Sequence, residues 1–250
     1  MLVRYLQATK WDYQKTFDAV LMHNEWTIQT RPHICPNKQL AVDMLTKNGF
    51  IYFFRRDKFL RPIVVVNIAK LKTLSADDLE SFVPTISYLM TYSIQKALIP
   101  GKAECFVNII DLNGVSMTSI PVTAIKRFLQ SSQTNFRGRT YKTFILNANM
   151  IIRGSFGIVK SMIDEFSAQK INMLGSDFRK HLLEIIEPHN LEKRFGGTVP
   201  DKTGGFFPPD FSEQGQTMIT KDEYLTQLNG PVEKVALEEV KSYEQPSLIA

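Results

Sequence analysis

Residues 50–68 read FIYFFRRDKFLRPIVVVNI, and this stretch decides the fold class. Two runs of Ile, Val and aromatic side chains, Phe50–Phe54 and Ile63–Ile68, flank a short charged segment. Both runs are apolar at successive positions, which predicts strands that are buried on both faces. Such strands lie inside a sheet that helices cover on each side.

Three more apolar segments of strand length follow, and helical patterns separate them. The further strands are predicted at Cys105–Ile110, Thr143–Asn147 and Ile171–Leu174. The helices are predicted from Ser75 past Leu98, from Ser119 onward, over about Gly154–Phe166, and after a cap at Ser176. Alternating strands and helices form βαβ units, so the sequence predicts an α/β domain with a mostly parallel sheet.

Segments of different character stand on either side of this pattern. Asp12 is predicted to cap a helix that runs to about Gln29, with an apolar stripe made of Trp11, Phe17, Val20, Leu21 and Trp26. Residues 1–49 are therefore predicted to form a helical N-terminal lobe. Residues 50–207 are predicted to form the α/β domain, and residues 208–250 a C-terminal extension with short helices.

The composition excludes several classes of protein. Of the 250 residues, 44% are hydrophobic and 22% are charged, which is ordinary for a globular chain and excludes a disordered one. The sequence has no run of about 20 apolar residues that would span a bilayer. The N-terminal residues lack a signal-peptide pattern, and two cysteines are too few for a disulfide framework. We therefore expect a cytoplasmic protein.

The net charge of +5 is unevenly distributed. No acidic residue occurs between Leu112 and Ile163, where seven residues are basic. Such a surface suits an anionic partner, although a solvated basic face without a partner is the alternative. RNP-type aromatic strands are missing, and the basic residues do not alternate with aromatic ones. The charge pattern therefore favours transient contact with an anionic membrane and argues against nucleic acid.

Catalytic and metal-binding patterns are missing from the sequence. There is no G-x-G-x-x-G, P-loop or G-x-S-x-G motif. The four histidines are scattered, without H-E-x-x-H or a cysteine–histidine cluster. The sequence therefore predicts a binding protein without catalytic residues or a metal site, and not an enzyme.

Six short motifs occur in a fixed order along the chain. They are LVRYLQATKWD at 2–12, DKFLRP at 57–62, IDLNG at 110–114, NAN at 147–149, KINMLG at 170–175 and NLEKRFGGT at 190–198. In this order and spacing they resemble the CRAL-TRIO family of lipid-binding and lipid-transfer proteins. Members of that family include phosphatidylinositol transfer proteins and retinaldehyde and tocopherol binders. The resemblance covers the chain from Met1 to about Thr198.

The resemblance implies a protein that encloses one phospholipid in an apolar cavity and exchanges it at membranes. In the family the sheet is the floor of the cavity and a mobile gate helix closes its mouth. Here the gate helix is expected at about Ser155–Phe166. Its candidate gate and cavity residues are Phe156, Ile158, Val159, Met162, Ile163 and Phe166. The ligand is expected to be phosphatidylinositol, phosphatidylcholine or both.

The resemblance also implies a headgroup site. The candidate ligand-binding residues are Lys10, Lys170, Arg139, Ser116, Thr118 and Ser167. Family members that bind phosphatidylinositol use a basic pair, a glutamate and a lysine. The basic pair falls on Thr9 and Lys10, the glutamate on Gly138 and the lysine on Lys170, so this chain keeps two of the four. Ser116 and Thr118 match positions whose hydroxyls contact choline in members that carry phosphatidylcholine, although an ordinary turn role fits them equally well.

Other functions stay open at this point. The ligand is alternatively a retinoid, a tocopherol, a sterol or haem, because the family glutamate is missing. A second alternative is a regulatory module that recruits a partner to membranes without transferring lipid. A third is an enzyme whose residues are not recognised. We expect a monomer with no cofactor apart from the bound phospholipid.

Overall fold

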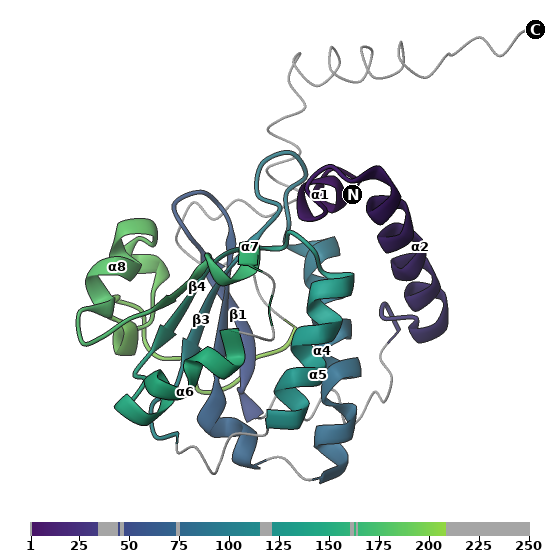
Figure 1. The fold of residues 1–250 in the computed structure, drawn as a ribbon. Coiled ribbons are helices and arrows are strands. Elements are labelled where there is room, and N and C mark those ends of the chain that lie inside the picture. The colour runs from purple at the N-terminus through teal and green to yellow at the C-terminus, as the bar shows by residue number, and fades with distance from the viewer. Residues whose placement is uncertain are drawn as a thin grey trace, which may run out of the picture.

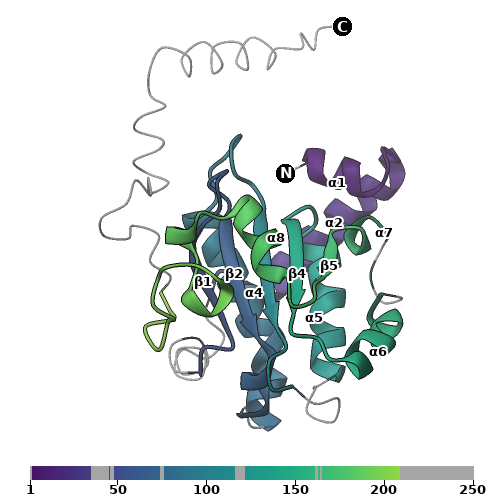
Figure 2. The ribbon, with the colours of Figure 1, turned by 90° about the vertical axis from the view of Figure 1, so that its left-hand side faces the viewer.

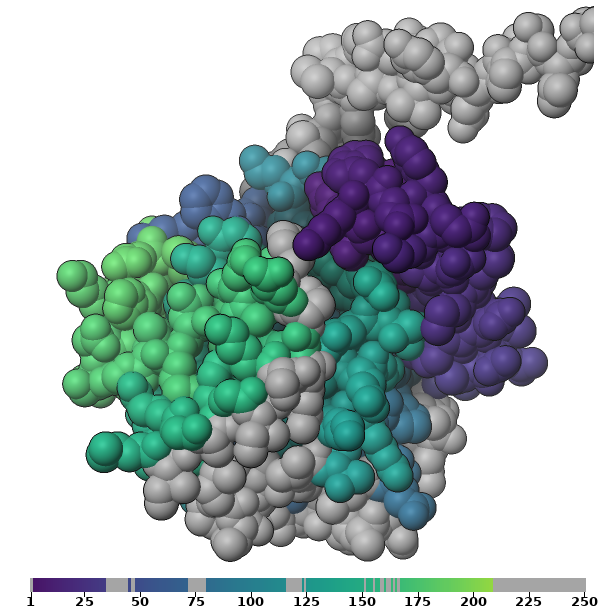
Figure 3. Space-filling model, in the orientation of Figure 1, coloured from purple at the N-terminus to yellow at the C-terminus, as the bar shows by residue number. Residues whose placement is uncertain are grey.

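The computed structural model describes residues 2–34, 45, 48–73, 76–115, 122–160, 163 and 165–208. A helical N-terminal lobe comes first, with α1 (Leu2–Ala8) and α2 (Tyr13–Thr30). The lobe lies beside α5 (Val122–Asn135), as the space-filling view shows on this side of the molecule (Figure 3). The C-terminal extension lies outside the described residues, so the predicted domain boundaries stay a prediction.

A five-stranded sheet forms the centre of the molecule (Figure 1). Its strands are β1 (Ile51–Arg56), β2 (Pro62–Asn67), β3 (Phe106–Asp111), β4 (Thr140–Leu146) and β5 (Ile171–Met173), and they lie in this order. β1 pairs with β2 antiparallel, and every later pair is parallel. The predicted α/β class with a mostly parallel sheet is therefore confirmed, and each strand lies within a few residues of its predicted place.

Helices cover both faces of the sheet. They are η2 (Ile68–Thr73), α4 (Ala76–Lys96), α5, α6 (Met150–Lys160), α7 (Glu165–Ala168), α8 (Phe178–Ile185), η4 (Pro188–Asn190) and η5 (Lys193–Phe195). One face packs against α4 and α5, with α2 outside them (Figure 1). The other face packs against α8, which lies across the sheet in Figure 2. α8 begins after Asp177, one residue later than the predicted cap at Ser176, and α4 ends two residues before Leu98.

The N-terminal lobe confirms one prediction and corrects another. The Asp12 carboxylate accepts a hydrogen bond from the Lys15 backbone N–H at 3.0 Å, so it caps α2 as predicted. The apolar stripe packs only in part: Phe17 is 59% exposed and Leu21 is 45% exposed, whereas Trp26 is half-buried and its ring packs edge-on against Phe136. α2 also packs through Thr16 and Ala19, which are buried.

The prediction of one continuous helix over Gly154–Phe166 is wrong. The chain forms two helices here, α6 and the separate short α7. α6 begins four residues earlier than predicted because the Asn149 side chain accepts a hydrogen bond from the Ile152 N–H at 2.9 Å. This bond satisfies one of the free N–H groups at the start of a helix.

The candidate gate residues are only partly visible. Phe156 is half-buried and packs against the core on the α4 side of the sheet, and Ile163 is half-buried between α6 and α7. Ile158 and Val159 lie in α6 and Phe166 in α7, but their side chains are not described. Met162 lies outside the described residues altogether. The predicted gate therefore stays a prediction.

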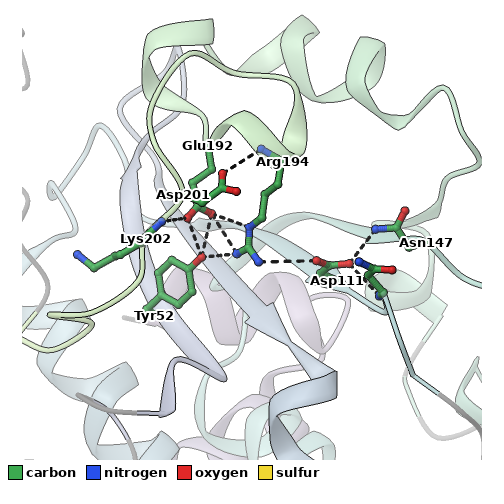
Figure 4. A network of polar contacts seen from close by, with 8 residues as sticks. Tyr52, Asp111, Asn147, Glu192, Arg194, Asp201 and Lys202 are labelled. Atoms are coloured by element: carbon green, nitrogen blue, oxygen red, sulfur yellow. Dashed lines mark hydrogen bonds and ion pairs between the residues drawn. The ribbon is translucent and has the colours of Figure 1, made fainter.

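A buried polar network ties the end of the described chain to the sheet (Figure 4). The Glu192 carboxylate accepts hydrogen bonds from the Tyr52 hydroxyl, from the Arg194 guanidinium and from the Lys202 backbone N–H. Arg194 in turn lies 3.8 Å from the carboxylate of Asp111, at the end of β3. The network thereby fixes the segment after α8 against the carboxyl ends of the strands.

Candidate functional site

The two faces of the sheet differ in how completely they are covered. On the α8 side every core side chain of β1 to β4 is buried, with Ile63, Val107, Ile109 and Leu146 at 0% exposure. On the opposite side, Val66, Ile110, Ile171 and Met173 are only half-buried. The pairing register places Val66, Ile110 and Met173 in one row across the sheet, with the buried Ile145 between Ile110 and Met173. We call these four half-buried side chains the apolar floor.

A polar group lies beside the apolar floor. The Asn108 amide donates hydrogen bonds to the hydroxyls of Thr143 at 3.1 Å and Thr140 at 3.3 Å. Asn108 and Thr143 are register partners on the same face, one row nearer the amino ends of the parallel strands. The floor is therefore polar at one end and apolar at the other.

Four charged residues gather beyond the polar end of the floor, and we call them the basic cluster: Arg4, Glu104, Arg139 and Lys170. Arg4, from α1, forms an ion pair with Glu104, which precedes β3. The Arg139 guanidinium donates to the Glu104 carbonyl at 3.0 Å and lies 3.8 Å from its carboxylate. The Lys170 ammonium donates to the Thr140 carbonyl at 2.8 Å. The cluster thus joins the N-terminal lobe to the amino ends of the strands.

The electrostatics of the basic cluster reflect the excess of cations. Burial, with the charge of Arg4, lowers the pKa of Arg139 to about 10. The pKa of the Glu104 carboxyl lies below its usual value, mainly because the Gly101 N–H donates to it, with Arg4 and Arg139 adding to the effect. Burial raises the pKa of the Cys105 thiol, while Lys170, Arg139, Arg4 and Arg61 oppose that rise. The charges of four cations therefore reach the Cys105 thiol, directly before β3.

Tyr5 adds a neutral hydrogen-bonding group to this region. Its side chain is 3% exposed, and its hydroxyl has no hydrogen-bond partner among the described residues. Burial raises the pKa of this hydroxyl, while the charges of Arg137, Arg4 and Arg139 act in the opposite direction. A buried hydroxyl without a partner is unfavourable, so Tyr5 is a candidate donor to an anion.

The structure brings together only some of the predicted ligand residues. Arg139 and Lys170 lie in the basic cluster, and Ser167 is next to them because its carbonyl accepts from the Lys170 N–H at 3.2 Å. Lys10 is exposed in the turn between α1 and α2, and among the described residues no contact joins it to Lys170. The two hydroxyl candidates, Ser116 and Thr118, lie outside the described residues.

Sequence reasoning missed Arg4 and Glu104. Gly138, where the family has glutamate, has a φ of +67°, and a Cβ there would lie 3.0 Å from the Cδ of Arg4. The Arg4 side chain therefore occupies the space beside residue 138. The carboxylate that pairs with Arg4 comes from Glu104. Arg4 stands within the motif at 2–12, and this is the only signal the sequence held. Nothing in it indicated that Arg4 meets Glu104, 100 residues away.

A hollow lies near the two helices of the gate region. Its volume is about 420 Å³, and its described lining residues are Lys160, Ile163, Glu165, Ala168 and Gln169. This volume is within the usual range for small-molecule sites, about 300–1,000 Å³. In the described ranges, no three His, Cys, Asp or Glu side chains are placed to hold a metal ion. No helix in those ranges is long and apolar enough to cross a bilayer.

Comparison with known proteins identifies the family. The model of the CRAL/TRIO domain matches residues 46–197, more than half of the chain. The chain belongs to the CRAL/TRIO domain family. This confirms the resemblance that the six motifs indicated.

The individual relatives of this CRAL/TRIO chain share about a quarter of the aligned residues or fewer. It is 25% identical over 221 residues to the Sec14 cytosolic factor of Schizosaccharomyces pombe, covering 78% of this chain and 73% of that protein. It is also 25% identical over 228 residues to the phosphatidylinositol/phosphatidylcholine transfer protein SFH11 of Arabidopsis thaliana, covering 82% of this chain but only 59% of that protein. The crystal structure of Sfh5 matches with a TM-score of 0.66 over 95% of this chain and 80% of that chain, at 15% identity. The Sfh5 match confirms the CRAL/TRIO fold.

Proposed function

We propose that this chain binds one phospholipid, either phosphatidylinositol or phosphatidylcholine, and exchanges it at membranes. The observation that carries the proposal is the unequal covering of the sheet. Ile110 and Met173 lie half-buried on one face, whereas Ile109 on the other face is fully buried. Half-buried apolar side chains beside α6 and α7 suit an apolar ligand, and the basic cluster suits its anionic headgroup.

The polarity of the site orients an amphiphile. Its headgroup lies toward Asn108, Lys170 and Arg139, and its chains extend over Ile110 and Met173. The chains need this cover because a two-chain phospholipid leaving a bilayer exposes on the order of 30 methylenes, at about 0.8 kcal/mol each. Each charge-assisted hydrogen bond to the headgroup phosphate would contribute roughly 1.5–3 kcal/mol.

The names of the relatives support the same function. One relative is named a phosphatidylinositol/phosphatidylcholine transfer protein, and two others are named cytosolic factors. By this likeness the chain is a lipid carrier and not an enzyme, and it works in the cytoplasm with transient contact to membranes. We take the functional unit to be a monomer, because one sheet face and one basic cluster suffice for one lipid.

A vesicle transfer assay tests the proposal. Labelled phosphatidylinositol and labelled phosphatidylcholine are supplied in donor vesicles, and their arrival in acceptor vesicles is measured. Lys170→Ala is compared with wild type and with Lys126→Ala, which removes an exposed lysine from α5. We expect Lys170→Ala to slow phosphatidylinositol transfer about tenfold, with Lys126→Ala unchanged. No transfer of either lipid by the wild type would refute the proposal.

The transfer assay also tests whether Lys10 contributes to headgroup binding, and a separate measurement tests the alternative ligands. Lys10→Ala should leave phosphatidylinositol transfer near the wild-type rate, because no contact of the described residues joins Lys10 to the basic cluster. Mass spectrometry of organic extracts from the purified protein distinguishes a phospholipid from a retinoid, a tocopherol, a sterol or haem. A purified protein that carries one of those four ligands in stoichiometric amount would replace the phospholipid assignment.

A further inference from the structure

A second hollow opens on the surface beside the basic cluster. Its volume is about 350 Å³, and it lies where β2, β3 and β4 begin. Its lining residues are Arg61, Gly101, Lys102, Ala103, Glu104, Cys105 and Tyr141. Glu104 belongs to both, so the hollow adjoins the basic cluster.

Arg61 is held rigidly in this hollow. Its Nε donates to the Asp57 carboxylate at 2.7 Å, and its guanidinium carbon lies 3.3 Å from the centre of the Tyr141 ring. Its Nη2 is buried and has no hydrogen-bond partner among the described residues. A fixed guanidinium with an unused donor is the group that binds phosphate oxygens best.

Lys102 supplies a second cation at the rim. It is exposed, and no ion pair or hydrogen bond of its ammonium occurs within the part of the chain that the structure describes. The carboxylate in the hollow does not compete for it, because Glu104 already accepts from the Gly101 N–H at 3.1 Å and pairs with Arg4. The hollow therefore offers donors and an uncompensated charge to an anion.

The charge balance indicates how many phosphates fit. The hollow and the basic cluster hold five cations, Arg4, Arg61, Lys102, Arg139 and Lys170, and one carboxylate, Glu104. The buried Asp57, which pairs with Arg61 behind the hollow, adds a second carboxylate. Five cations against two carboxylates leave a net charge of +3. A phosphodiester brings one negative charge, and each added phosphomonoester brings about 1.5 to 2 more. A headgroup with one phosphodiester and one phosphomonoester comes close to neutralising the site.

We infer that the hollow around Arg61 and Lys102 is a second phosphate subsite, so that this chain prefers an inositol headgroup with at least one ring phosphate. The phosphodiester lies at the basic cluster, and the ring phosphate accepts from Arg61 Nη2 and Lys102. This inference rests on the proposed function for the position of the headgroup. The same chemistry occurs in a membrane lipid and in a free inositol phosphate, so the test has an arm for each.

Binding is measured to vesicles of phosphatidylcholine that contain phosphatidylinositol, to the same vesicles with phosphatidylinositol bisphosphate, and to soluble inositol trisphosphate. The wild type should bind the bisphosphate vesicles at least about tenfold more tightly than the phosphatidylinositol vesicles. Lys102→Ala should remove most of that difference without changing binding to phosphatidylinositol. Lys126→Ala is the matched control, and Arg61→Ala is avoided because it would leave Asp57 buried without its partner.

Each outcome has one meaning. Equal affinity for the two kinds of vesicle, or a bisphosphate preference that Lys102→Ala leaves intact, overturns the second subsite while the lipid-transfer proposal stands. Tight binding of soluble inositol trisphosphate that Lys102→Ala weakens supports the subsite and identifies a free headgroup as a second source of ligand. No transfer of phosphatidylinositol or phosphatidylcholine refutes the proposed function separately.

Discussion

The Tyr52 hydroxyl donates a hydrogen bond to the Glu192 carboxylate, 2.8 Å away, although 140 residues separate them in the sequence. The Glu192 side chain is fully buried, and it also accepts from Arg194 and from the Lys202 N–H. Glu192→Ala would remove the carboxylate that accepts from three buried or half-buried donors, Tyr52, Arg194 and the Lys202 N–H. We expect it to lower the free energy of unfolding by about 3–5 kcal/mol, and Tyr52→Phe by about 1–2 kcal/mol.

Urea denaturation measures both effects. Glu184→Ala, which removes an exposed carboxylate from α8, is the control and should change stability by less than about 0.5 kcal/mol. If Glu192→Ala were as stable as Glu184→Ala, the network would not hold the segment after α8 in the way described here.

The ion pair between Arg4 and Glu104 predicts a dependence of stability on pH. The pKa of the Glu104 carboxyl is lowered in the folded protein, first by the Gly101 N–H and then by Arg4 and Arg139. A lowered pKa gives stability that is complete above the unfolded pKa and is lost as the pH falls through the folded one. Wild type should therefore be more stable than Glu104→Gln near neutral pH, by less than about 1 kcal/mol because the side chain is 41% exposed.

Urea denaturation over a pH series checks this sign. The difference between wild type and Glu104→Gln should shrink as the pH falls below 4.5, the ordinary value for this carboxyl. A difference that grows toward acid pH would show that the ion pair does not stabilise the contact between the N-terminal lobe and the sheet.

Gly138 predicts that the family glutamate cannot simply be restored. Its φ of +67° disfavours any side chain, and a Cβ would meet Arg4 at 3.0 Å. We expect Gly138→Glu to cost about 1–2 kcal/mol of stability and to displace Arg4 from Glu104. Thermal unfolding measures the loss of stability. The transfer assay measures whether the displacement of Arg4 changes the rate of phosphatidylinositol transfer. A variant that is as stable as wild type and transfers phosphatidylinositol faster would contradict this account of the site.

The polar end of the floor predicts an effect on headgroup binding. Asn108→Leu removes the amide that joins Thr140 and Thr143, and we expect it to weaken phospholipid binding about five- to tenfold. Asn24→Leu, which changes an exposed amide of α2 away from the sheet, is the control. Equal binding by the two variants would show that the ligand does not contact Asn108.

The strands were predictable because their signal is local. The run Ile63–Ile68 is apolar at every position except Asn67, and a strand buried on both faces places these side chains inside. The single helix over Gly154–Phe166 was predicted wrongly at its start, because the beginning of α6 depends on the side chain of Asn149 and not on apolar periodicity. The prediction that Phe17 and Leu21 pack was wrong for another reason. Apolar periodicity does not identify the face on which a helix contacts the rest of the protein.

The candidate site was predictable only in part. Lys170 and Arg139 followed from motifs; the structure places Arg139 beside the Glu104 carboxylate and has the Lys170 ammonium donate to the Thr140 carbonyl. Glu104 carried no motif, and its role arises from contacts with Arg4 and Arg139 that form only when the lobe and the sheet are together. Long-range pairs of this kind are determined by the fold and not by the residues next to them in the sequence.

Native mass spectrometry of the purified protein, before and after incubation with phospholipid vesicles, tests the central claim most directly. We predict a species whose mass exceeds the chain by one two-chain phospholipid, which organic solvent removes and which vesicles restore. A protein that has the mass of the chain alone after both treatments would contradict the claim that the half-buried face of the sheet holds a lipid.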